Sequence, residues 1–104
     1  MNTKKTLIAA RKRIEKKENW TYRVMARDKW GHRVDRCSPR AVRYCALGAV
    51  YLETMSMLEF LGATLDKLME AIGGESIAIY NNRHAHAEVL AMFNKAITMA
   101  EKEE

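Results

Sequence analysis

Apolar residues recur at helical spacing near the start of the chain. Leu7, Ala10 and Ile14 lie three and four positions apart, and Ile8 widens the same stripe, which is the period of a helix that buries one face. The pattern therefore predicts an amphipathic helix over residues 4–18. Its opposite face is basic and carries Lys5, Lys12, Arg13, Lys16 and Lys17.

The apolar period changes to two in the segment WTYRVMARD, residues 20–28. Trp20, Tyr22, Val24 and Ala26 alternate with mainly polar neighbours, as in a strand with one face on the core. The residues from Asp28 to Gly31 are typical of a turn, and the short polar segment after them can pair back as a hairpin. We therefore expect a small β-hairpin after the first helix.

The longest apolar stretch of the chain follows the residues SPRAV. Ser38 can cap free amide groups and Pro39 suits a first helical position, so a helix is predicted over about residues 39–55. It is apolar over most of its circumference, which indicates a central helix covered on several sides. Gly48 costs roughly 1 kcal/mol of helix propensity relative to alanine, so we expect another backbone to approach its smooth face closely.

The second half of the chain is predicted to contain helices separated by short breaks. For residues 56–72 one bent helix and two short helices both remain open, while Gly73 and Gly74 predict a left-handed helix end. A last helix is expected from about His84. The predicted fold is α+β and mostly helical, with four or five helices packed around the central one, in a single domain of residues 1–104 whose ends, 1–3 and 101–104, fray.

The net charge of +5 conceals an uneven distribution of charge. Residues 1–43 contain 14 Lys or Arg and 4 Asp or Glu, whereas residues 44–104 contain 4 and 9. Such a field favours an anionic partner, either nucleic acid, a nucleotide or an acidic protein surface. We expect the partner to contact Arg23, Arg27, Lys29, Trp30, Arg33 and Arg36, with a second patch formed by Lys12, Arg13, Lys16 and Lys17.

The histidines and cysteines do not form a recognisable metal or catalytic motif. On a helix His84 and His86 would point about 200° apart, which makes it hard for them to share one ion, so no metal or cofactor is expected. Cys37 and Cys45 are expected to be free thiols, with Cys45 buried. Cys37 and His32 can be drawn as nucleophile and base, but no catalytic constellation supports that reading, and we expect a protein that is not an enzyme.

Three segments of the chain together resemble a small family of domains found in actinobacteria and tailed phages. They are NWTYRVMARDKWG, SPRAVRYCALGAVYL, and IYNN followed by EVLAMFNKAI; Tyr44 and Tyr80 stand where that family has tryptophan, and Asn82 replaces an acid. The resemblance implies a compact, mostly helical domain of bacterial or phage origin, and it supplies no activity. The family has a polar motif at Tyr80, Asn81 and Asn82, which with Arg83 form a minor candidate ligand site. Asn81 or Asn82 can also cap the last helix.

The expected function is non-catalytic binding in the cytoplasm of a bacterial host. We expect a phage or bacterial accessory or anti-defence factor, an inhibitor that binds a host protein or a complex handling nucleic acid through its basic N-terminal face. Direct binding of DNA, RNA or a nucleotide is the alternative, and a small enzyme is the second alternative. No membrane span is expected, because Glu53 and Glu59 interrupt the longest apolar region. A homodimer through spare apolar helix surface remains open.

Overall fold

The computed structural model describes residues 2–103, in which five α-helices and one small antiparallel sheet form the fold. This confirms the predicted α+β, mostly helical class. The helices are α1 (Thr3–Arg13), α2 (Ala46–Thr54), α3 (Leu61–Ala71), α4 (Ile77–Arg83) and α5 (His86–Lys102); the strands are β1 (Ala26–Arg27) and β2 (Arg43–Tyr44), and two 3-10 turns are η1 (Lys17–Asn19) and η2 (Leu58–Phe60).

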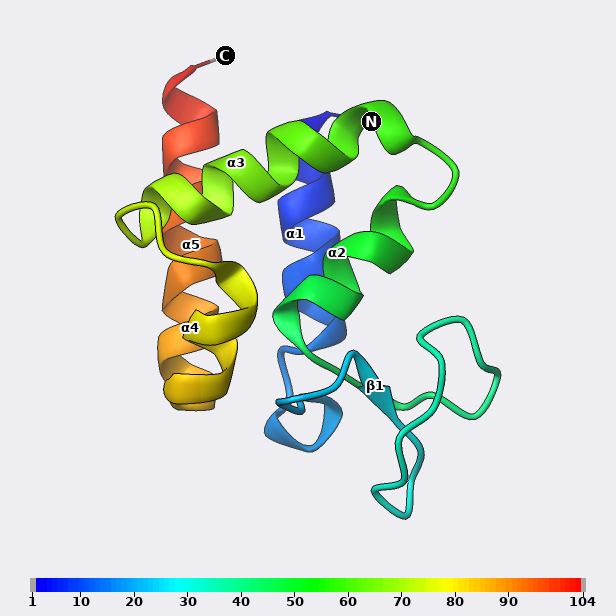
Figure 1. The fold of residues 1–104 in the computed structure, drawn as a ribbon. Helices are drawn as coiled ribbons and strands as arrows, with labels where there is room; N and C mark the ends of the chain where they lie inside the picture. Colours follow the sequence, from blue (N-terminus) through cyan, green and yellow to red (C-terminus); the bar gives the residue numbers. More distant parts are fainter. Residues whose placement is uncertain (1, 104) are drawn as a thin grey trace.

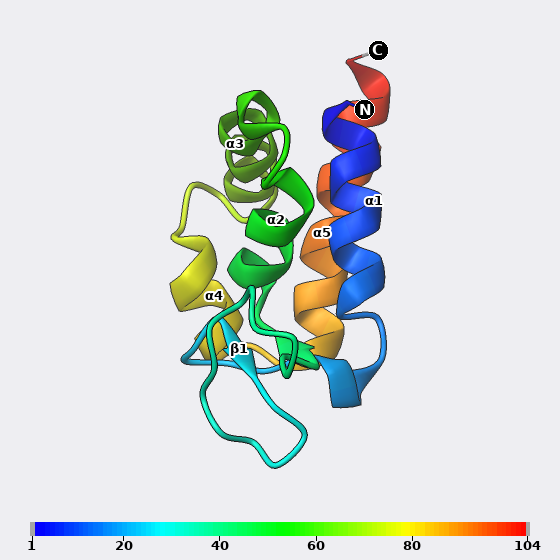
Figure 2. The same cartoon turned by 90° about the vertical axis from the view of Figure 1, so that its right-hand side faces the viewer.

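The helices form two layers. Figures 1 and 2 show α1 and α5 side by side, with α2, α3 and α4 covering one face of this pair. The irregular segment that contains β1 extends from one end of the layers. Among the described residues no helix is long and apolar enough to cross a bilayer. Met1 and Glu104, part of the predicted frayed ends, lie outside the described residues.

The apolar stripes of the helices meet in one core. Leu7 of α1 and Ile14 just after it, Val50 of α2, Leu68 of α3 and Phe93 of α5 are all fully buried there. Burial of each such side chain stabilises the fold by roughly 1.5–3 kcal/mol. The helical period in the sequence therefore located the core side of α1 and α5 correctly, although α1 ends at Arg13 and not at residue 18.

The predicted strand over residues 20–28 is wrong for most of its length. Only Ala26 and Arg27 are paired as a strand, and Arg23 adopts the left-handed region with φ 70°. This turn reverses the alternation, since Thr21 is buried while Tyr22 is 47% exposed. The turn at Asp28–Gly31 is confirmed, because Gly31 N donates to Asp28 O at 3.0 Å and Gly31 has φ 86°.

The central helix begins later than its Ser-Pro start signal predicted. Ser38 and Pro39 form a turn in which Ser38 Oγ accepts from Arg40 N at 3.1 Å. The next residues pair with the β1 segment, and Cys45 caps the helix in place of Ser38. The helix-start signal of Ser38 and Pro39 does not decide the conformation here. Pairing with the β1 segment gives the backbone N–H and C=O groups of residues 42–45 their hydrogen-bond partners, and buried backbone groups need such partners.

The second half of the chain settles the alternatives left open by the sequence. Residues 56–72 contain a single α-helix, α3, which follows directly on the 3-10 turn η2, so two separate short α-helices are not formed there. Gly73 and Gly74 have φ 75° and 90°, as predicted. The segment before the last helix forms α4, so Asn81 and Asn82 lie inside a helix and do not cap α5. Glu88 fills that role in part by accepting from Ala85 N at 3.1 Å.

A close backbone contact fixes α2 against the segment before β1. A Cβ atom on Gly48 would overlap the carbonyl oxygen of Met25, which also accepts a hydrogen bond from Cys45 N at 3.1 Å. The close approach predicted at Gly48 is therefore confirmed. Gly62, near the start of α3, has open space around it.

We expect Gly48→Ala to lower the free energy of unfolding by about 1–3 kcal/mol, because the added methyl group must push the Met25 carbonyl away. Gly62→Ala is the matched control, and it should raise stability by up to about 1 kcal/mol because alanine favours the helix and meets no neighbour. Urea unfolding of both variants measures the difference. Equal effects at the two positions would contradict the close contact.

Candidate functional site

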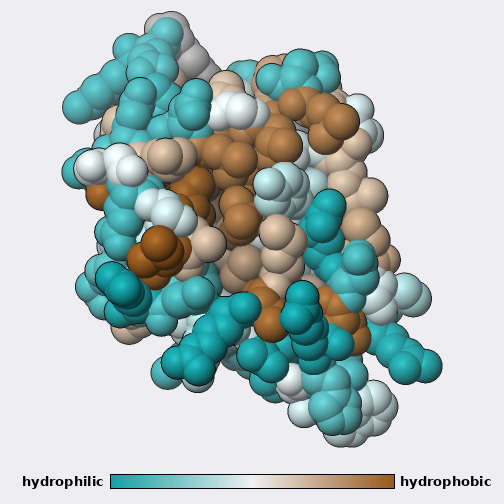
Figure 3. All heavy atoms as spheres, viewed as in Figure 1, coloured by the Kyte–Doolittle hydropathy of each residue, from teal (hydrophilic) through white to brown (hydrophobic). Residues whose placement is uncertain are grey.

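The cations expected to bind an anion lie on the irregular segment between η1 and α2. Figure 3 shows hydrophilic side chains gathered at that end of the molecule. The set comprises Arg23, Arg27, Lys29, Arg33 and Arg36, joined by Arg40 and Arg43.

None of these seven cations forms an ion pair with a carboxylate within residues 2–103, whereas three of the five cations on α1 do. Lys4 pairs with Glu101 at 3.1 Å, and Arg13 pairs with Glu53 at 2.7 Å. Uncompensated positive charge is therefore concentrated on the loop. Of the second predicted patch, Lys12, Lys16 and Lys17 are exposed, and Arg13 is engaged by Glu53.

Trp30 forms the exposed aromatic part of this region. Its side chain is 68% exposed, and Lys29 Nζ lies 4.6 Å from the ring centroid. A hollow of about 460 Å³ opens beside the ring and is lined by Asp28, Lys29, Trp30, Pro39, Arg40 and Val42. The prediction that Trp30 is exposed is confirmed. Trp20 is half-buried, but Tyr22, expected in the core, is also exposed.

Asp28 holds the turn that presents Trp30. Its Oδ1 accepts from Trp30 N at 3.0 Å and from His32 N at 2.9 Å. Burial by itself would raise the pKa of Asp28, but the two backbone N–H donors and the nearby charges of His32 and Arg40 outweigh it and lower that pKa below its ordinary value. The carboxylate is therefore a structural acceptor as well as a charge beside the hollow.

Two of the predicted arginines have internal roles. Arg27 donates from Nε to Thr21 Oγ1 at 2.8 Å and from Nη1 to the Gly31 carbonyl at 2.9 Å, so its guanidinium is engaged within the loop. The Arg36 guanidinium lies over the Tyr51 ring at 5.0 Å, and its Nη1 is 3.8 Å from Met25 Sδ. These contacts hold Arg36 at the edge of the face.

A smaller hollow of about 210 Å³ joins the basic loop to the predicted polar motif of α4. Arg23, Arg33 and Asn82 all line it. The backbone N–H of Arg23 donates to Asn82 Oδ1 at 2.6 Å. The structure thus brings together residues that the sequence placed in two separate candidate sites.

Asn81 is the polar residue whose role the sequence analysis missed. It is 1% exposed, and its Oδ1 accepts from Trp20 Nε1 at 2.9 Å and from Ala46 N at 3.0 Å. Its Nδ2 donates to the carbonyl of Thr21 at 3.1 Å. The available signal was its spacing, because Asn81 follows the buried Ile77 by four residues and so lies on the buried face of α4.

The histidines near α4 contact neighbouring groups of the protein. The rings of His84 and Tyr80 stack at 3.7 Å, and His86 Nε2 lies 2.6 Å from the Ile14 carbonyl, at the end of α1. Because a carbonyl only accepts, His86 must carry its proton on Nε2. Arg83 is exposed at the end of α4. In the part of the chain that the structure describes, no three His, Cys, Asp or Glu side chains are grouped to hold a metal.

The two cysteines differ in exposure and contacts. Cys45 is buried as predicted, its Sγ accepts from Gly48 N at 3.2 Å, and burial raises the pKa of its thiol. A raised pKa keeps the group as a thiol, whereas the thiolate is the reactive form. Cys37 is exposed, and no hydrogen bond joins its side chain to His32 within residues 2–103.

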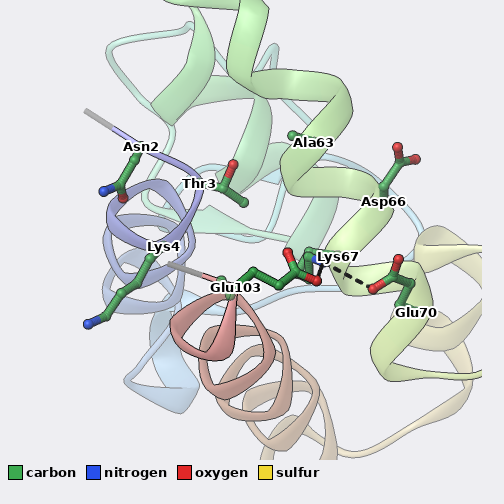
Figure 4. A pocket seen from close by; sticks show the side chains of 9 residues that line it. Asn2, Thr3, Lys4, Ala63, Asp66, Lys67, Glu70 and Glu103 are labelled. Atoms are coloured by element: carbon green, nitrogen blue, oxygen red, sulfur yellow. Dashed lines mark hydrogen bonds and ion pairs between the residues drawn. The ribbon is translucent and has the colours of Figure 1, made fainter.

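Another hollow, of about 420 Å³, lies at the opposite end of the helices and is lined by ion-paired residues (Figure 4). Lys67 donates to Glu70 at 3.1 Å and also to Glu103, near the end of α5. The hydrogen bond that Lys67 donates to Glu103 is the main reason that the pKa of Lys67 is raised, although burial opposes it. The positive charge of Lys67 is already compensated by Glu70 and Glu103. This hollow therefore attracts an anion less strongly than the basic loop does.

We expect Asn81→Asp to lower the free energy of unfolding by roughly 2–4 kcal/mol, because it places a carboxylate against the Thr21 carbonyl and loses a buried donor. Asn82→Asp makes the same change on an exposed residue that keeps its acceptor role, so its effect should stay within about 0.5 kcal/mol. Urea unfolding of the two variants compares them directly. Similar losses at both positions would contradict the role assigned to Asn81.

The lowered pKa of Asp28 should make the Trp30 turn sensitive to acid. Because the folded-state pKa lies below the unfolded value of about 3.9, the carboxylate contributes stability above that pH and loses it as the pH falls through the folded pKa. We expect the melting temperature of the wild type to exceed that of Asp28→Asn near neutral pH and the gap to narrow as the pH falls below the ordinary pKa of an aspartate, about 3.9. A gap that does not change with pH would refute this assignment.

Comparison with known proteins places the chain in a family without assigning it an activity. Neither a curated protein nor a solved structure matches it significantly. Residues 1–99 match the model of a family described as a family of unknown function, DUF6197. Since the match covers nearly the whole sequence, the chain belongs to the family of unknown function DUF6197.

Proposed function

We propose that this protein binds single-stranded nucleic acid without catalysis, through a surface that we call the basic loop face. The observation that carries the proposal is the exposed Trp30 ring, with Lys29 beside it, among loop cations that have no carboxylate partner in the described chain. The basic loop face consists of Arg23, Lys29, Trp30, Arg33 and Arg40.

The two kinds of side chain on the basic loop face match the two parts of a nucleotide. Lysine and arginine neutralise phosphates and release their counterions, which supplies affinity without sequence preference. An exposed aromatic ring stacks on an unpaired base, a contact worth about 1–3 kcal/mol per base. Bases inside a duplex are already stacked on each other, so the exposed Trp30 favours single strands over duplexes.

Binding of single-stranded nucleic acid by the basic loop face is consistent with the cellular role expected from the sequence. A phage or bacterial accessory or anti-defence factor in the cytoplasm could act on a complex that handles nucleic acid by occupying its exposed strand. Contact with an acidic protein surface is a second candidate, supported by the same unpaired cations. In that case oligonucleotides would compete with the protein partner weakly or not at all.

Fluorescence anisotropy with labelled oligonucleotides at about 50 mM salt tests the proposal. We expect binding to single strands that weakens steeply as salt rises, and a loss of about fivefold to a hundredfold for Trp30→Ala. Trp30→Phe should retain most of the affinity because it keeps a ring. Lys29→Ala and Arg40→Ala should each reduce the salt slope by about 0.7, as expected for one lost phosphate contact on a single strand.

The control for charge is Lys95→Ala, since Lys95 is exposed on α5, far from the loop in sequence, and lines neither hollow of the loop. It should leave the affinity and the salt slope nearly unchanged. Absence of binding to single-stranded and double-stranded DNA and RNA at low salt would refute the proposed function. Equal losses of affinity for Lys95→Ala and Lys29→Ala would show that binding depends only on the net charge of the protein.

A further inference from the structure

The smaller hollow beside the basic loop face has the chemistry of a specific anion site. We call it the arginine pocket; its volume is about 210 Å³. Three parts of the chain meet there, namely the loop, the start of α2 and α4. Its lining residues include no Asp or Glu; its polar side chains are those of Arg23, Arg33, Asn81 and Asn82, beside the thiol of Cys45.

The two arginines of the pocket lack a counter-charge. Both are exposed, and within residues 2–103 neither pairs with a carboxylate. Two like charges that share one small hollow repel each other, and an anion between them converts that repulsion into attraction. A guanidinium also presents several N–H donors in a planar fork that matches the oxygens of phosphate.

Asn82 adds a donor and supports the backbone of Arg23. Because Asn82 Oδ1 accepts the Arg23 N–H, the amide orientation is set and Nδ2 remains available as a donor. Arg23 has φ 70°, a left-handed conformation that is unfavourable for a residue with a side chain. The hydrogen bond to Asn82 therefore helps to hold the conformation that places Arg23 at the pocket.

The remainder of the lining excludes competing charge. Val24, Met25, Leu47 and Ala78 are apolar, and the Cys45 thiol stays neutral because burial raises its pKa. Apolar walls lower the local dielectric constant, which strengthens the attraction between the arginines and an anion. Asn81 is engaged by its three internal hydrogen bonds.

We propose that the arginine pocket binds a phosphate monoester. A monoester carries up to two negative charges and three terminal oxygens, enough for two guanidinium groups and one amide. An internal phosphodiester of a strand carries one charge and offers fewer free oxygens. The inference rests on the proposed function for the source of this group, which is the phosphorylated end of a strand; a free mononucleotide presents the same chemistry.

Binding of matched oligonucleotides to the full chain tests the pocket. Strands of one sequence that carry a 5′-phosphate, a 3′-phosphate or no terminal phosphate are compared by anisotropy, and a nucleoside 5′-monophosphate and inorganic phosphate by calorimetry. We expect one terminal phosphate to raise the affinity at least about tenfold, the gain typical of charge-assisted hydrogen bonds. Tighter binding of the phosphorylated strand than of the mononucleotide identifies the strand end as the source.

Two variants test the residues. Asn82→Asp keeps the acceptor for Arg23 N–H but replaces the free donor with a negative charge, so the phosphate advantage should disappear while the melting temperature stays equal or rises. Arg23→Gly suits the left-handed backbone and removes one guanidinium, so it should reduce the advantage about tenfold or more. Lys95→Ala removes a charge elsewhere and should keep the full advantage.

The outcomes separate this inference from the proposed function. Equal affinity of wild type for phosphorylated and unphosphorylated strands, or an undiminished advantage in Asn82→Asp, would overturn the pocket and leave single-strand binding intact. Binding of inorganic phosphate and mononucleotide that Asn82→Asp abolishes, without binding of any unphosphorylated strand, would support the pocket and overturn the proposed function.

Discussion

The side chain of Asn81 is the contact on which the position of the whole basic loop depends. One carboxamide joins Trp20 and Thr21, at the start of the loop, to Ala46, the first residue of α2. These partners are 35 to 61 residues away from it along the chain. Because Asn81 is 1% exposed, solvent cannot replace a lost partner. Both ends of a long irregular segment are therefore held by one satisfied amide.

Neighbouring residues of the same kind divide between structure and surface. Both asparagines line the arginine pocket, but the side-chain amide of Asn81 is engaged in internal hydrogen bonds. Arg27 likewise bonds inside the loop while Arg33 stays exposed, and Trp30 is far more exposed than the half-buried Trp20. Arg27, for example, donates to the Gly31 carbonyl in the turn that presents Trp30. A loop with only two-residue strands can thereby hold surface side chains in defined positions, as a binding site requires.

Sequence periodicity located the elements whose stability comes from a continuous apolar stripe, and α1 and α5 are the clearest cases. It failed where distant backbone groups decide the conformation. Arg23 reverses the strand pattern through a bond to Asn82, 59 residues away. Ser38 and Pro39 signalled a helix, but the pairing of β2 with β1 delays it until Ala46. The basic character of the site was visible in the sequence, while its hollows depend on contacts between segments that no local pattern encodes.

The distribution of ion pairs explains why the loop, and not the helices, is the surface to consider for binding. Helical cations such as Arg13 and Lys67 have acidic partners, so their charges already contribute to folding. The loop cations repel one another and form no ion pair with a carboxylate among residues 2–103, although the charge of Asp28 lies near that of Arg40. The Trp30 ring is exposed, so it does not contribute to the stability of the fold by burial. The repulsion among the loop cations and the exposure of Trp30 both lower the stability of the protein without a ligand. An anionic ligand that carries a flat aromatic base would offset both.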